Sequence, residues 1–138
     1  MCLKGINIYN FVEIGGFIMT TIHDLLHSLG VTGKYNGYSM AVKACDLIME
    51  DESRLLKVTK SLYPEVAKQC GVGKITVERN IRTIIYKAWD TNRAKLCEIA
   101  RFELTTPPTA TEFLDMLVSH FRKIQQEEKE DLMKVTKQ

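Results

Sequence analysis

Apolar residues recur at helical spacing along most of the chain, and the alternation typical of strands is nearly absent. The first helical pattern covers Thr21 to Leu29 and stops at Gly30. A second covers Tyr38 to Met49, and a third continues from Leu55 to Leu62. Such a run of patterns predicts an all-α fold, a compact domain of about six helices.

The middle of the chain combines a short helix, a glycine and a long helix. Pro64 suits the first turn of the short helix, and Gly71 suits its end because glycine tolerates a positive φ. The long helix runs from about Lys74 to Trp89, with the apolar stripe Val77, Ile81, Ile84, Ile85, Ala88 and Trp89. This order predicts a helix-turn-helix with a long recognition helix. The residues expected to join its two helices are Val66, Ala67, Cys70, Val72 and Val77.

Residues 1–18 make a poor signal peptide, because polar residues interrupt the apolar run and no small-residue cleavage site follows. The codons of Gly15 and Gly16 fit a ribosome-binding sequence at a suitable distance before Met19. We therefore expect residues 1–18 to be a leader that is not natively translated, with Met19 as the natural start.

The last helix begins where Thr109 and Glu112 have the spacing of a capping box. Its apolar positions continue as far as Ile124. Residues 125–138 are charged and sparsely apolar, which predicts a solvated helical extension or a frayed tail. The compact helical domain is accordingly expected over residues 19–124.

The composition is that of a folded globular chain. The 138 residues are 45% hydrophobic and 26% charged, which is typical of a single domain. No apolar run approaches the roughly 20 residues needed to cross a bilayer, so no membrane partner is expected. Four scattered cysteines without a CxxC pair favour a reducing compartment, and we expect a cytoplasmic protein.

The positive charge is concentrated in one stretch. The formal net charge of the whole chain is +2, yet residues 57–95 carry nine basic and three acidic groups, a net charge of +6. The remaining segments are neutral or negative. A concentrated basic segment is typical of proteins that bind polyanions, although solvated lysines on helices give the same count.

In a helix-turn-helix, the second helix lies in the DNA major groove and its first turns reach the base edges. Lys74 and Arg79 would neutralise phosphates or read guanine, and Glu78 would accept a hydrogen bond from a cytosine amino group. The other candidate DNA contacts are Thr76, Asn80, Arg82, Thr83 and Lys87. An alternative stays open, in which Glu78 and Arg82 form only a surface ion pair.

Two further motifs are weaker signals of chemistry. His23 and His27 have the spacing of a zinc-protease helix, but Asp24 replaces the glutamate that serves as general base, and no third ligand follows. The sequence GVGK before the long helix lacks the strand, the first glycine and the Ser or Thr of a phosphate loop. We expect no enzyme, no metal site, no cofactor and no small-molecule substrate.

Three stretches together resemble a known family: HSLGVTGKYNGY, LYPEVAKQCGVGKITVERNIRTIIYKAW and PPTATEFLDMLVSHF. From about Thr21 to Arg122, the chain resembles the C-terminal effector domain of stage zero sporulation protein A, a bacterial response regulator that commits cells to sporulation. The resemblance implies an all-helical DNA-binding domain whose recognition helix carries the signature VERxIR. Here the signature consists of Val77, Glu78, Arg79, Ile81 and Arg82.

By this resemblance, Glu78 and Arg79 match residues that read bases, and Arg82 matches one that contacts the DNA backbone. Family members usually have an arginine where this chain has Thr76, and a small polar residue where it has Ile75. The preferred DNA sequence should therefore differ from that of the family, or be read less stringently. The family's phosphoacceptor receiver domain has no room in this chain, so we expect a stand-alone effector domain.

The sequence thus predicts a sequence-specific, DNA-binding transcription regulator that is associated with the nucleoid. Its expected partner is double-stranded DNA. The resemblance also implies a contact with the sigma subunit of RNA polymerase through Asp90 to Phe102, and a homodimer on DNA. An alternative of another class stays open: an interaction module or antagonist that keeps the fold but pairs with a related effector domain or a sigma factor.

Overall fold

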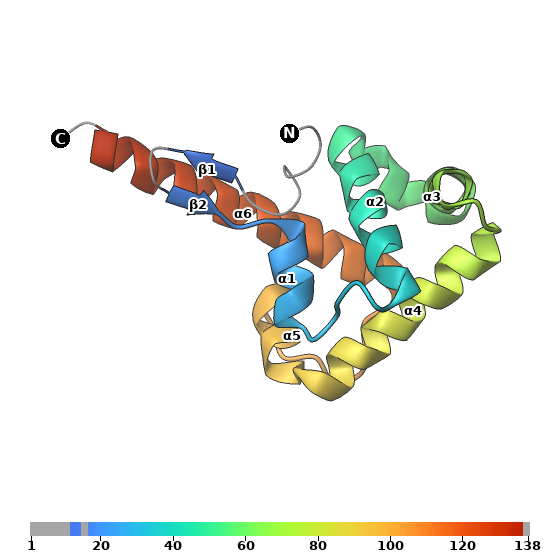
Figure 1. The fold of residues 1–138 in the computed structure, drawn as a ribbon. Coiled ribbons are helices and arrows are strands. Elements are labelled where there is room, and N and C mark those ends of the chain that lie inside the picture. Colours follow the sequence, from blue (N-terminus) through green and yellow to red (C-terminus); the bar gives the residue numbers. More distant parts are fainter. Residues whose placement is uncertain (1–11, 15–16, 137–138) are drawn as a thin grey trace.

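The computed structural model describes residues 12–14 and 17–136 of the chain (Figure 1). Its helices and strands, in chain order, are β1 (Val12–Ile14), β2 (Phe17–Met19), α1 (Ile22–Ser28), α2 (Asn36–Glu50), the 3-10 helix η2 (Glu52–Lys57), the π-helix η3 (Val58–Leu62), α3 (Tyr63–Cys70), α4 (Lys74–Thr91), α5 (Arg93–Ala100) and α6 (Ala110–Thr136). The predicted all-α class with six α-helices is confirmed. No helix of the described residues is long and apolar enough to cross a membrane.

The core forms around α2, which packs against α1, α3, α4 and the first half of α6. Each of these helices has an apolar stripe, and burying the stripes against one another removes them from water. The largest fully buried side chains include Leu26 of α1, Ile48 of α2, Ile81 of α4 and Phe113 of α6. Helix α4 is therefore held by one continuous core rather than by its neighbour α3 alone.

Helices α2 and α4 approach each other closely where they cross. A Cβ atom added to Gly37, in the first turn of α2, would lie 2.2 Å from the backbone carbonyl oxygen of Asn80. Only glycine leaves room for this contact, because real Cβ atoms do not come so near to a backbone oxygen. Gly37 consequently sets how deeply α4 lies against α2.

Two helix starts follow the capping chemistry of the sequence. Thr21 precedes α1 and forms a capping box with Asp24, so the helix itself begins one residue later than expected. Before α6, the backbone N–H of Thr109 donates to Glu112 Oε1 at 2.9 Å, and the N–H of Glu112 donates to Thr109 Oγ1 at 3.1 Å. The predicted start of the last helix is confirmed.

The third predicted helix differs from expectation in its type. Residues from Glu52 to Leu62 form the 3-10 helix η2 and the π-helix η3, with a break at Lys57, whose φ is −135°. The side chain of Leu56 is 85% exposed, although the helical pattern placed it among the buried positions. The reason is the change of helical period, because a 3-10 turn of 3.0 residues rotates side chains away from the faces expected at 3.6.

A two-stranded hairpin precedes the helical domain, in a region where the sequence led us to expect no strands. β1 pairs antiparallel with β2 in the register Val12 to Met19, Glu13 to Ile18 and Ile14 to Phe17. The two intervening residues are both glycine, a composition frequent in tight hairpin turns. The rest of the expected leader, residues 1–11 and 15–16, lies outside the described residues, so the expected start at Met19 stays a prediction.

The predicted helical extension is the C-terminal half of α6, which continues without interruption to Thr136 and runs alongside the hairpin (Figure 1). Thr20 links the two features. Its backbone N–H donates to Glu128 Oε1 at 3.0 Å, and its hydroxyl donates to Glu128 Oε2 at 2.6 Å. The extension therefore contacts the segment that leads into α1.

Candidate nucleic-acid interface

The predicted helix-turn-helix consists of α3, a three-residue turn and α4. Gly71 ends α3 in the left-handed region, with a φ of 71°, and the N–H of Val72 closes the turn on the carbonyl of Ala67 at 3.0 Å. Ala67 is buried where the two helices meet. Val72 does not join the pair as expected, because its side chain is 37% exposed beyond the turn.

The buried face of α4 matches the predicted apolar stripe except at Trp89. The buried face consists of Val77, Ile81, Ile84, Ile85 and Ala88. The exposed face consists of Lys74, Ile75, Arg79, Arg82, Thr83, Tyr86 and Asp90. Trp89 lies at the boundary, partly buried against the core rather than within it, with the guanidinium of Arg93 3.9 Å from the centre of its ring.

The middle of the exposed face is formed by Arg79 and Thr83. Both side chains are exposed, and they follow one another by one helical turn. The Thr83 hydroxyl donates to the carbonyl oxygen of Arg79 at 3.0 Å, so its oxygen lone pairs remain able to accept a hydrogen bond. Two apolar side chains lie on the same face, Ile75 at 66% and Tyr86 at 51% exposed.

One edge of this face is formed by Glu78 and Arg82. Arg82 Nη2 lies 2.8 Å from Glu78 Oε2, and both side chains are about half exposed. This is the ion pair that the sequence left open, and such a pair contributes at most about 0.5 kcal/mol to stability. The pair lies beside Tyr63 of α3, whose pKa is raised by burial and further by Glu78, while Arg82 opposes the shift.

The opposite edge of α4 faces α2 and the loop before it. Thr76 and Asn80 are half-buried there, and the Asn80 amide donates to Met40 Sδ at 3.6 Å. The ammonium group of Lys87 lies 5.9 Å from the centre of the Tyr35 ring. Thr76 and Asn80 therefore border a groove between α2 and α4, while Lys87 lies beside Tyr35 at its edge and Arg79 does not line it.

Two basic residues beyond α4 belong to the same surface. Lys34 lies 5.5 Å from the centre of the Tyr35 ring, so Tyr35 is approached by Lys34 and Lys87 together. Lys43 of α2 lines a depression of about 450 Å³ with Thr76 and Asn80. Neither Lys34 nor Lys43 was selected from the sequence, because both lie outside the basic stretch 57–95. In the sequence, the one indication was that Lys34 lies in the glycine-rich loop before α2.

His23 and His27 do not lie free on the outer face of α1. His23 Nδ1 forms a hydrogen bond with the Tyr38 hydroxyl, and the His27 ring stacks on the Tyr38 ring with their centres 5.5 Å apart. Burial, and then the charge of His27, lowers the pKa of His23, while Asp24 opposes the shift. Within residues 12–14 and 17–136, no group of three His, Cys, Asp or Glu side chains could hold a metal ion.

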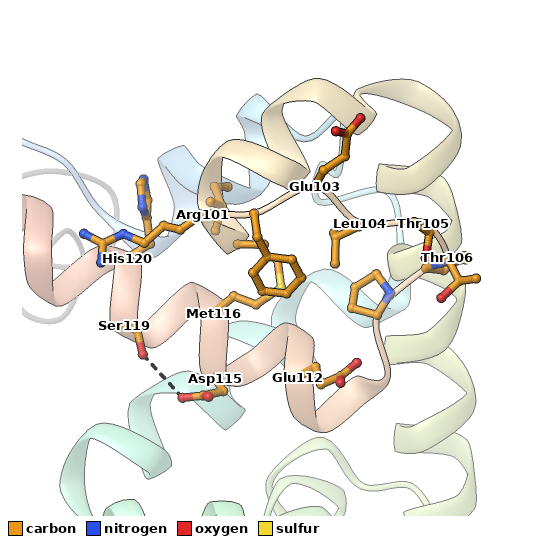
Figure 2. Close-up of a pocket in the computed structure, with 15 residues that line it drawn as sticks. Arg101, Glu103, Leu104, Thr105, Thr106, Glu112, Asp115, Met116, Ser119 and His120 are labelled. Carbon is orange, nitrogen blue, oxygen red and sulfur yellow. Dashed lines mark hydrogen bonds between the residues drawn. The ribbon is translucent and has the colours of Figure 1, made fainter.

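The segment expected to contact sigma runs from the end of α4 to the loop after α5. This loop borders a cleft of about 490 Å³ whose other wall is α6, with Met116, Ser119 and His120 (Figure 2). Arg101 turns the chain into the loop with a φ of 71°, unusual for a residue other than glycine. Phe102 follows with 64% of its side chain exposed.

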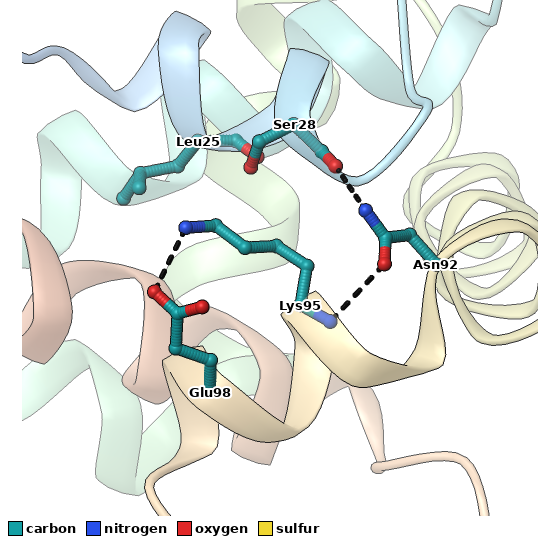
Figure 3. A network of polar contacts seen from close by, with 5 residues as sticks. All are labelled: Leu25, Ser28, Asn92, Lys95 and Glu98. Atoms are coloured by element: carbon teal, nitrogen blue, oxygen red, sulfur yellow. Dashed lines mark hydrogen bonds and ion pairs between the residues drawn. The ribbon is translucent and has the colours of Figure 1, made fainter.

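The joint between α4 and α5 is fixed to α1 by Asn92 (Figure 3). The side-chain oxygen Oδ1 of Asn92 accepts a hydrogen bond from the backbone N–H of Lys95 at 3.2 Å, which caps α5. The side-chain Nδ2 of Asn92 donates to the carbonyl oxygen of Ser28 at 2.9 Å. Lys95 Nζ lies 2.9 Å from Glu98 Oε2 on the exposed side of α5. The start of the candidate sigma segment is therefore anchored to α1.

The chain matches the model of a known protein family. The family described as "Sporulation initiation factor Spo0A C terminal" matches residues 22–121, which is most of the chain and all of the helix-turn-helix. This is a family of DNA-binding effector domains of sporulation regulators, not of enzymes. The match runs from the first residue of α1 into α6.

Proposed function

The chain belongs to the family of Spo0A C-terminal domains, and from this membership we propose that it is a sequence-specific DNA-binding transcription regulator of the sporulation type. The recognition helix is α4, which would enter the major groove with its exposed face toward the bases. A protein that binds DNA in this way acts in the cytoplasm, on the nucleoid.

The observation that carries the proposal is the position of Arg79 on α4. Arg79 is exposed in the second turn of the helix, between Lys74 at its start and Thr83 one turn further on. A planar guanidinium at this position can donate two hydrogen bonds to O6 and N7 of guanine. Gly73, which precedes α4, has no side chain to cap the helix, so the first N–H groups favour a phosphate oxygen.

The remaining candidates take secondary roles in this proposal. Glu78 and Arg82 separate from each other at little cost, because their exposed ion pair is weak, and then contact a base and a phosphate. Lys87, with Lys34 and Lys43 across the groove, contacts phosphates at one edge of the helix. Thr76 and Asn80 lie deeper in the groove beside α2 and position the helix.

Selection of bound sequences from a random double-stranded DNA pool, at moderate salt, tests the proposal. We expect one enriched motif, and a motif with two half-sites would support the predicted homodimer on DNA. Enrichment of no motif would overturn sequence-specific binding. In that case, the competing function as a protein-binding antagonist is tested by titrating the chain against a related effector domain and against a sigma factor.

The predicted sigma contact has its own test at Phe102. Aromatic residues, phenylalanine included, are enriched in protein interfaces, and Phe102 is 64% exposed. We expect Phe102→Ala to reduce transcription from a target promoter severalfold while leaving DNA affinity unchanged, as measured by in vitro transcription and fluorescence anisotropy. The matched control is Met133→Ala, because Met133 is 57% exposed in the distant half of α6. Equal transcription by both variants would contradict the contact.

A further inference from the structure

Ile75 presents a large apolar side chain to solvent in the first turn of the recognition helix. Its side chain is 66% exposed, whereas Val77, two residues later, is completely buried. The core therefore does not account for an isoleucine at this position. Nor does helix formation, because a β-branched residue loses side-chain freedom in a helix.

The position of Ile75 on α4 places it among the groups proposed to meet DNA. At about 100° per residue, Ile75 and Arg79 differ by roughly 40° around the helix axis and lie one turn apart. Their Cβ atoms are therefore neighbours about 6 Å apart. An exposed methyl-bearing side chain thus lies directly beside the arginine proposed to read guanine.

The chemistry of the major groove supplies one apolar partner for such a side chain. Thymine carries a 5-methyl group there, and the other base edges of unmodified DNA offer mainly donors and acceptors. We infer that Ile75 packs against the 5-methyl group of a thymine and so selects thymine at one position of the site. This inference rests on the proposed function, and it assigns to Ile75 a role in specificity that Lys74 and Arg79 cannot perform.

Replacement of thymine by deoxyuridine tests the contact, because it removes the methyl group and leaves the base pair intact. Each thymine of the selected motif is replaced in turn, and affinity is measured by fluorescence anisotropy at constant salt. For the natural protein, we expect one replacement to lower affinity about fourfold, the value of one buried methyl group. Ile75→Ala should bind the thymine and deoxyuridine forms of that site equally.

Leu56→Ala is the matched control, because Leu56 is a similarly exposed aliphatic side chain in η2, outside α4. This variant should lose the same fourfold on deoxyuridine replacement as the natural protein does. Ile75→Val, which keeps a branched apolar side chain, should retain most of the methyl preference. Circular dichroism spectra show whether each variant is folded, and the measurement on the natural protein needs no variant at all.

The outcomes separate this inference from the proposed function. A protein that selects a motif but is insensitive to every deoxyuridine replacement overturns the methyl contact and leaves DNA recognition intact. The same holds if Ile75→Ala keeps the full sensitivity, or if the selected motif contains no thymine. A protein that selects no motif overturns both proposals.

Discussion

Arg79 and Lys74 differ in what they can read, although both are exposed cations near the start of α4. The guanidinium of Arg79 is a planar fork that fits the two acceptors of guanine, whereas the ammonium group of Lys74 is a point charge that fits any phosphate. The difference makes them a matched pair for separating specificity from affinity.

We expect Arg79→Ala to lower affinity for the selected motif by about 1–3 kcal/mol and to relax the preference at one base pair. Lys74→Ala should weaken binding to all sequences alike. It should also reduce the slope of log affinity against log salt concentration by about 1, the value for one phosphate contact. Anisotropy titrations against cognate and scrambled DNA at several salt concentrations measure both effects. Lys129→Ala, an exposed cation in the far half of α6, should change neither. Equal losses on both DNAs for Arg79→Ala would show that this residue reads no base.

At the level of single residues, helical spacing predicts which side chains of α4 lie at the centre of its exposed face. The helical spacing places Arg79 and Thr83 opposite the apolar stripe, and both are exposed. It places Thr76, Asn80 and Lys87 there too, yet these three are half-buried. Ile75 and Tyr86 are exposed beside them without having been predicted so. The sequence cannot show that Asn80 is directed toward Met40, because that contact depends on where α2 lies. Side chains at the centre of a helix face are thus predictable, and those at its edges depend on tertiary packing.

At the level of elements, the spacing of apolar residues predicts the α-helices that have a continuous apolar stripe. It does not predict the segments in which the number of residues per turn departs from 3.6. The long helix α4 and the start of α6 follow directly from an apolar stripe and a capping box. Residues 52–62 have the composition of an α-helix, yet they form η2 and η3, because the break at Lys57 interrupts the α-helical backbone. The hairpin of β1 and β2 was missed because each strand has only three residues, too few for alternation to be visible.

The close contact between α2 and α4 at Gly37 predicts how a substitution there changes stability and DNA affinity. Gly37→Ala would bring a Cβ atom to 2.2 Å from the Asn80 carbonyl oxygen, so the helices must separate. We expect the free energy of unfolding to fall by about 1–3 kcal/mol and DNA affinity to fall with it, because α4 shifts relative to Lys34 and Lys43. Urea denaturation and anisotropy measure the two effects.

Gly33→Ala is the control for this crossing. Gly33 has no atom within 4 Å of an added Cβ, so the substitution should change stability by less than about 0.5 kcal/mol. Equal stability of the two variants would mean that the helices do not approach as closely as the structure has them.

At the level of the whole molecule, the candidate interface joins parts that are distant in sequence. The loop before α2 contributes Lys34 and Tyr35, α2 contributes Lys43, and α4 contributes Lys87. The charge count of the sequence identifies α4 but cannot bring the two additional lysines to it, since only the packing of α2 on α4 does so. The sequence therefore identified Lys74, Arg79, Arg82 and Lys87 of this basic surface and missed Lys34 and Lys43.

The stability of the whole domain should depend on pH through two histidines. Burial lowers the pKa of His23 and of His120 from the usual value of 6.5. Below about pH 6.5 the unfolded chain binds protons that the folded chain does not, so the free energy of unfolding falls as the pH falls through this range. Urea denaturation at pH 7.5 and pH 5.5 measures the loss, which should be smaller in His23→Gln. An equal loss in that variant would contradict a contribution from His23.

The bond between Thr20 and Glu128 connects positions 108 residues apart in the sequence. An amide proton exchanges with solvent water only when its hydrogen bond opens. The exchange rate of the Thr20 amide therefore reports the opening of the last turns of α6, and removal of residues 125–138 should accelerate it. We therefore expect the segment around Thr20 and the end of α6 to open together, independently of α4.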